Sequence, residues 1–122
     1  MSYGDTGNAG GPELDFSVLP AGKTVGIQLV ALAASKSIFP RGGVLLGWSV
    51  LEPAGAAAAV ILHDGADTSG EIRGAISLAS KGQAFAWLGP QGVPVFNQLY
   101  AEVVAGQVTG VVWVRTPSSV TE

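Results

Sequence analysis

The segment GVLLGWSVLEPAGAAAAVILHDGADTSGEIRGAISLASKG, residues 43–82, decides the fold class. Its short apolar runs are separated by Pro, Gly, Asp and Ser, the residues that favour turns. In residues 71–78 apolar side chains recur at every second position, so that one face carries Ile72, Gly74, Ile76 and Leu78. This is the period of two of a half-buried strand. The segment therefore predicts β-structure.

The run of residues 44–52 is apolar on both faces. We expect it to form a central strand that is covered on both sides, with Trp48 in the core. Residues 34–43 are expected to form a loop, and Pro94 confines residues 93–96 to the edge of a sheet. Further strands are expected at residues 24–31, with Ala31 on the core face, at 57–63, and at 83–88, with Phe85 and Trp87 on one side.

The last two strands, residues 98–104 and 107–114, are predicted to form a hairpin joined by Ala105 and Gly106. In the second of them Trp113 falls on the face away from the core, a position where aromatic side chains often mark interfaces. About eight strands, with turn signals every 8 to 12 residues, are typical of a sandwich or jelly roll. We therefore expect an all-β fold, a single β-sandwich, jelly-roll-like domain over residues 21–117.

The two ends of the chain differ from this pattern. Residues 1–20 are rich in glycine and acidic, and are predicted to form an extended N-terminal arm, while residues 118–122 form a C-terminal tail. Such an arm cannot bury enough of its own surface to order itself. It docks either on a neighbouring subunit or back on its own domain, and the sequence leaves both open. Its large apolar side chains include Tyr3, Leu14 and Phe16.

The composition favours binding and assembly over catalysis. Charged residues make up 12% of the 122 residues, whereas about a quarter is usual in a domain of this kind. Hydrophobic residues make up 48%, so we expect part of the apolar surface to lie against another chain. The absence of cysteine excludes disulfides and thiolate metal sites.

The same numbers disfavour several partners and locations. A net charge of −3 with six scattered basic residues argues against nucleic acid, because phosphate binding needs grouped basic side chains. The apolar runs are shorter than the roughly 20 residues that span a bilayer, so no membrane insertion is expected. The first residues lack the basic start and apolar run of a secretion signal.

Residues 44–115 carry a resemblance to a known group of proteins. Its elements are a strand that ends near a Pro/Gly turn, the stretch VILHDG, a strand that contains the pattern G-x-I, and the closing sequence GVPVFNQLYAEVVAGQVTGVV. This series resembles small β-sandwich structural proteins of tailed bacteriophages, in particular capsid decoration (cement) proteins. The motifs consist of strand and turn residues and contain no catalytic or ligand set.

The resemblance implies a virion structural protein that binds the outer surface of the assembled capsid and stabilises it by non-covalent contacts. It implies the major capsid protein as partner, a homotrimer, synthesis in the host cytoplasm and a place on the capsid surface. No cofactor and no metal ion are expected. The residues expected to contact the capsid or another subunit are Tyr3, Leu14, Phe16, Trp87 and Trp113.

Three other interpretations remain open. Trp87 and Trp113 could form a platform for host-surface glycan in a tail or fibre module. His63 beside Asp64 could belong to a small hydrolase, although neighbouring strand residues point to opposite faces and no GxSxG motif is present. The oxygen-rich residues 64–71 could bind calcium, but they lack the DxDxDG spacing, and an acidic turn is the simpler interpretation.

Overall fold

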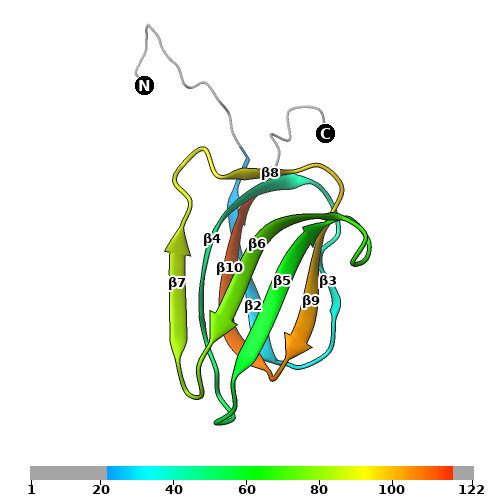
Figure 1. Ribbon diagram of the computed structural model, residues 1–122. Helices are drawn as coiled ribbons and strands as arrows, with labels where there is room; N and C mark the ends of the chain where they lie inside the picture. The colour runs from blue at the N-terminus through cyan, green and yellow to red at the C-terminus, as the bar shows by residue number, and fades with distance from the viewer. Residues whose placement is uncertain (1–21, 117–122) are drawn as a thin grey trace, which may run out of the picture.

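The computed structural model describes residues 22–116 as two antiparallel sheets packed face to face (Figure 1). This part of the chain contains no helix, and hence none that could cross a membrane. The expected all-β class is confirmed. The nine strands are β2 (Thr24–Leu32), β3 (Lys36–Phe39), β4 (Gly43–Leu51), β5 (Ala58–Asp64), β6 (Glu71–Leu78), β7 (Gln83–Trp87), β8 (Val93–Val95), β9 (Leu99–Ala105) and β10 (Val108–Arg115).

One sheet has five strands, in the order β2-β10-β4-β7, with β8 also paired to β4. The first residues of β4 pair with β8 and the last five pair with β7, so β7 and β8 share one edge of β4. Pro94 therefore lies in an edge strand, as predicted. The second sheet has the order β3-β9-β5-β6.

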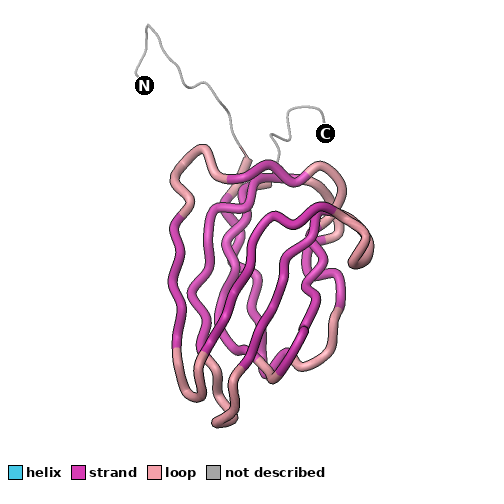
Figure 2. Tube along the Cα trace, viewed as in Figure 1, coloured by secondary structure: helices cyan, strands magenta, loops and turns pink. Residues whose placement is uncertain are grey.

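The chain passes repeatedly from one sheet to the other, as the tube in Figure 2 shows. Among the described strands, only β5 and β6 follow one another along the chain and pair directly. The predicted hairpin over residues 98–114 is wrong, because β9 pairs with β3 and β5 whereas β10 pairs with β2 and β4. Gly106, with a φ of 66°, lies in a connection between the sheets.

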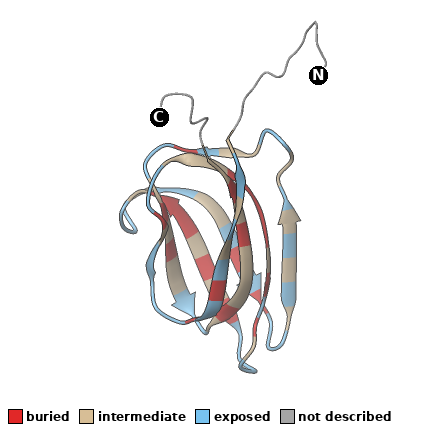
Figure 3. Cartoon of the chain, turned by 180° about the vertical axis from the view of Figure 1, so that it is seen from behind, coloured by how far each residue is buried: buried red, intermediate tan, exposed pale blue. Residues whose placement is uncertain are grey.

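The core lies between the two sheets, and Figure 3 shows the buried residues of the domain in red. Trp48 is 7% exposed and belongs to this core, as predicted. The outer side of β4 is not fully covered, contrary to expectation, since Leu51 is 43% exposed. The most deeply buried hydrophobic side chains are Leu45, Val60, Leu62, Leu99, Ala101, Val108, Val112 and Val114.

Two bulges overturn the predicted faces of β2 and β6. In β2 an extra residue opposite Thr109 gives Ala31 a φ of 46° and exposes it, so Leu32 takes the core position. In β6 the register shifts between Gly74 and Ile72, and Ile72 is consequently 60% exposed. A bulge inserts one unpaired residue and so reverses the alternation beyond it.

The predicted loop at residues 34–43 contains a strand, β3, which pairs with β9. Both ends of the described chain lie at the same end of the sandwich, because the backbone N–H of Thr116 donates to the carbonyl oxygen of Lys23 at 2.8 Å. The predicted arm, residues 1–20, and tail, residues 118–122, lie outside the described residues.

Candidate binding surface

The outer face of the five-stranded sheet carries a cluster of apolar side chains from β4, β7 and β10. Phe85 is 68% exposed and Trp87 is 55% exposed. The register of the sheet places Trp87 level with Trp113 and Phe85 level with Val111, with β4 between them. We call this surface the aromatic platform and define it as Leu51, Phe85, Trp87, Val111 and Trp113.

Small residues on β4 allow the aromatic rings to meet. Gly47 lies between Trp113 and Trp87 in the register, and Ser49 lies between Val111 and Phe85. The rings of Phe85 and Trp113 therefore reach across β4 and meet edge to face, with centroids 6.1 Å apart. This geometry is favourable for aromatic pairs. A Cβ atom at Gly47 would overlap the carbonyl oxygen of Ala86, so glycine is required there by the close approach of β7.

Charged side chains are divided unequally between the two sheets. In the described strands of the five-stranded sheet the only charged residue is Arg115, which donates to the carbonyl oxygen of Pro90 at 2.7 Å. The platform therefore lies on a nearly uncharged face. The other sheet contains Lys36, Asp64, Glu71, Arg73 and Glu102.

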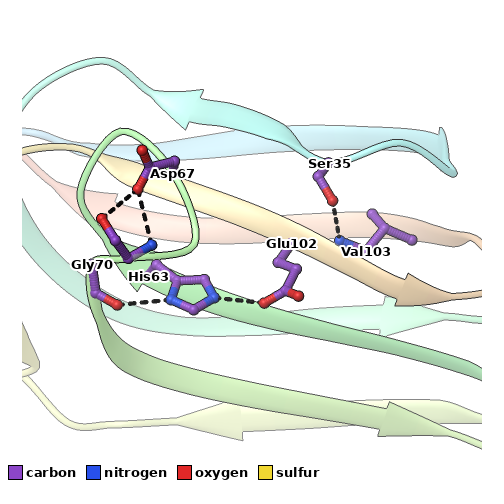
Figure 4. Close-up of polar contacts among 7 residues, drawn as sticks. Ser35, His63, Asp67, Gly70, Glu102 and Val103 are labelled. Carbon is purple, nitrogen blue, oxygen red and sulfur yellow. Dashed lines mark hydrogen bonds and ion pairs between the residues drawn. The ribbon is translucent and has the colours of Figure 1, made fainter.

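His63 is buried on the outer side of the four-stranded sheet (Figure 4). Its Nδ1 lies 2.9 Å from the carbonyl oxygen of Gly70, and its Nε2 lies 2.8 Å from Oε1 of Glu102. Both neighbours are acceptors, so both contacts are satisfied together only when the ring is protonated. Burial opposes the charged form, but these hydrogen bonds and the charge of Glu102 outweigh it and raise the pKa of His63. His63 thereby ties the end of the β5–β6 loop to β9.

Asp64, the neighbour of His63, points to different partners. Its carboxylate accepts the backbone N–H groups of Phe96 and Asn97, each at 2.9 Å, and Nη2 of Arg73 at 3.1 Å. Burial alone would raise the pKa of Asp64, but these three donors together lower it. The side chain joins β5 to the β8–β9 connection and to β6. The divergence of His63 and Asp64 agrees with the sequence argument against a catalytic pair.

In residues 64–71, which were weighed as a calcium loop or an acidic turn, the carboxylates bind groups of the protein itself. Asp67 accepts the backbone N–H of Ser69 at 2.9 Å, and Glu71 pairs with Arg73 at 3.1 Å. Within residues 22–116, no three acidic or histidine side chains are grouped so that they could hold a metal ion.

Sequence reasoning missed the role of Glu52, which is 1% exposed. Its carboxylate accepts backbone N–H groups from Ala54, Gly55 and Ala56 in the turn after β4, and from Lys81 in the β6–β7 turn. The hydrogen bond from Lys81 is the main cause of the lowered pKa of Glu52, which burial opposes. An acidic residue directly before Pro-Ala-Gly is the signal that could have indicated such a turn anchor.

The structure brings together two of the five residues predicted to contact a partner. Trp87 and Trp113 lie on the aromatic platform, and Phe85, Leu51 and Val111 complete it. Tyr3, Leu14 and Phe16 lie outside the described residues. Comparison of the chain with protein-family models, with curated proteins and with solved structures found no match.

Proposed function

We propose that this protein is a virion structural protein of the capsid decoration type, which binds the outer surface of the capsid through its aromatic platform. The observation that carries the proposal is an exposed aromatic cluster on a sheet face nearly free of charge. The proposed partner is the major capsid protein, and the proposed place of action is the capsid surface. The jelly-roll form, expected from the number and spacing of the strands, belongs to the same proposal. So does the homotrimer that the sequence resemblance implies.

The energetics of such a contact suit the platform. Burying apolar surface contributes about 25 cal/mol per Å² before the costs of association are subtracted. Tryptophan and other aromatic side chains frequently supply most of the binding energy at an interface. Many weak contacts on one particle add through multivalency, so a modest platform on each copy is sufficient.

The test is binding of the purified protein to capsids that lack decoration. We expect saturable binding at many copies per particle and a higher temperature of capsid rupture. Trp87→Ala should weaken binding at least tenfold. Val104→Ala is the matched control, because Val104 on β9 is also 55% exposed but lies on the other sheet. Undiminished binding by Trp87→Ala would contradict the proposed contact surface.

The N-terminal residues provide a second test of the same proposal. Deletion of residues 2–19 removes Tyr3, Leu14 and Phe16 and leaves the strands from Thr24 onward intact. The shortened protein should keep its unfolding midpoint and bind capsids more weakly, which circular dichroism and a capsid sedimentation assay would measure. Full binding by the shortened protein would show that these residues are not part of the contact.

The second candidate function is a tail or fibre module that binds host-surface glycan. The observation that favours it is the exposure of Phe85 and Trp87 beside Gln83, because aromatic rings with nearby amide groups suit a sugar. The two functions differ in stoichiometry, since a decoration protein is present in many copies per particle and a fibre module in few. Binding on a glycan array without binding to capsids would favour the second function.

A further inference from the structure

The two sheets present four main edge strands, and β7 is the one without a protective feature among the described residues. Sheet edges are usually protected by charges, prolines, bulges or short length. β2 has a bulge at Ala31, β3 has four residues and begins with Lys36, and β6 has charged residues and a bulge. By contrast, β7 has the sequence QAFAW and pairs with β4 without a register shift. In Figure 1 its outer side is free of other strands.

The hydrogen bonds between β7 and β4 show which backbone groups of β7 point away from β4. The N–H of Glu52 donates to the carbonyl oxygen of Gly82, and the N–H of Leu88 donates to that of Leu46, each at 2.8 Å. Because antiparallel pairs alternate, the intervening residues that face β4 are Ala84 and Ala86. The N–H and C=O groups that point to the free edge therefore belong to Gln83, Phe85 and Trp87.

We propose that two copies of the chain pair antiparallel along β7, about a two-fold axis at Phe85, so that their five-stranded sheets become one continuous sheet. In this register Phe85 pairs with the partner's Phe85, and Gln83 pairs with the partner's Trp87. All the outward backbone groups of the strand then find partners. The Phe85 and Trp87 side chains, which are 68% and 55% exposed, gain apolar neighbours on the outer face.

A second copy fits this edge because the strand is complementary to itself. Reversal about Phe85 places Ala84 opposite the partner's Ala86, so the small side chains on the core side meet without crowding. No charge is set against a like charge, since β7 has no charged residue. A five-residue edge buries less than the roughly 1,200 Å² of a standard stable interface. The dimer should therefore depend on concentration.

Proline at residue 85 separates edge pairing from packing of the aromatic ring. The Phe85 N–H points away from β4, so Phe85→Pro leaves the β4 ladder intact and blocks the pairing. Phe85→Ala is the matched control, because it removes the same ring and keeps the N–H. Sedimentation velocity over a range of concentrations should show a monomer–dimer equilibrium for the wild type and for Phe85→Ala. It should show at least tenfold weaker association for Phe85→Pro, with an unchanged circular dichroism spectrum.

Three sedimentation results would overturn the inference. They are a wild type that stays monomeric at millimolar concentration, a Phe85→Pro variant that associates as the wild type does, and a wild type that forms a trimer without a dimer. The pairing is isologous and closes at two copies, so the homotrimer of the proposed function would need a second, different contact. All of these measurements are made without capsids, so they do not depend on the proposed function.

A cross-link gives an independent readout that does not rely on the proline variant. The chain has no cysteine, so Phe85→Cys introduces a single thiol. Hydrogen-bonded antiparallel residues lie about 5.5 Å apart at Cα, which is within the range for a disulfide. Mild oxidation should give a covalent dimer of Phe85→Cys and leave Val104→Cys, an exposed control on the other sheet, mainly monomeric. Equal cross-linking of both variants would overturn the pairing.

Discussion

Replacement of Asp64 with alanine should destabilise the domain more than any other single removal of a charged side chain in the β5–β6 region. The carboxylate is 6% exposed and holds three donors, the backbone N–H groups of Phe96 and Asn97 and the guanidinium of Arg73. Asp64→Ala leaves the two N–H groups and one arm of the guanidinium without this acceptor. The connection between β8 and β9 then loses its attachment to β5.

The magnitude follows from the number and kind of these contacts. Hydrogen bonds to a charged group contribute about 1.5–3 kcal/mol each, and removal of one partner of a buried ion pair costs about 3–5 kcal/mol. Nη2 of Arg73 still lies 3.1 Å from Oε1 of Glu71, so the charge of Arg73 stays partly compensated. We therefore expect a loss of about 3–5 kcal/mol from a total free energy of unfolding of about 5–15 kcal/mol.

Urea unfolding followed by circular dichroism measures this loss. With a slope of about 2 kcal/mol per molar urea, the midpoint of Asp64→Ala should fall by about 1.5–2.5 M. Asp67→Ala is the control, because Asp67 is exposed and bonds only Ser69 in the same loop, and its midpoint should change much less. A loss below about 1 kcal/mol for Asp64→Ala would refute the reasoning, since even one unsatisfied buried donor costs about that much.

The pH dependence of this contribution has a definite sign. The pKa of Asp64 is lowered in the folded protein from an ordinary value of 3.8. The stabilisation is therefore fully present above about pH 4 and is lost as the pH falls through the lowered pKa. The difference in stability between the wild type and Asp64→Ala should be constant near neutral pH and shrink in strong acid.

Three further results are expected. An NMR titration should give His63 a pKa above 6.5. Its stabilising contribution is then present below pH 6.5 and is lost as the pH rises through the raised pKa. A pKa below 6.5 would contradict the two hydrogen bonds of the protonated ring. A double-mutant cycle with Phe85→Ala and Trp113→Ala should give a coupling of about 0.5–1.5 kcal/mol in thermal or urea unfolding, and a coupling near zero would contradict the edge-to-face contact. Gly47→Ala should lower the melting temperature of the domain by more than 5 °C, roughly the effect of 1–2 kcal/mol in a domain of this size. The reason is that the Cβ of the alanine would overlap the backbone of β7. An unchanged melting temperature would show that β7 can shift.

The strands themselves were largely predictable, because alternation of apolar residues is a local property. The regular parts of β4, β6 and β10 follow it, and Trp48 is buried as expected. The predicted assignment of side chains to the two faces was wrong where a strand contains an extra residue, as at Ala31 and beside Ile72. A bulge is fixed by the partner strand, here by the hydroxyl of Thr109 that accepts the N–H of Ala31 at 2.8 Å. The sequence of one strand does not contain that information.

The prediction that β9 pairs with β10 was wrong for a different reason. Two alternating runs joined by Ala105, Gly106 and Gln107 suit a hairpin and equally suit a connection between two packed sheets. The difference depends on which strands already occupy the edges of β9 and β10, and these come from distant parts of the chain. The same limit applied to the platform, since the outward positions of Trp87 and Trp113 were predicted but their meeting across Gly47 and Ser49 requires the strand order.

In the proposed assembly, pairing along β7 should strengthen binding through the aromatic platform. If β7 pairs about a two-fold axis perpendicular to the sheet, the two aromatic platforms lie on the same side of the joined sheet. Binding of one platform then makes binding of the second an intramolecular step, which raises the apparent affinity without any new contact. Each strand step also rotates the sheet by about 20–25°, so the two platforms face somewhat different directions. Such a pair suits two neighbouring capsid subunits better than one flat surface, and Phe85→Pro should therefore lose more capsid affinity than Phe85→Ala, although both lack the same ring.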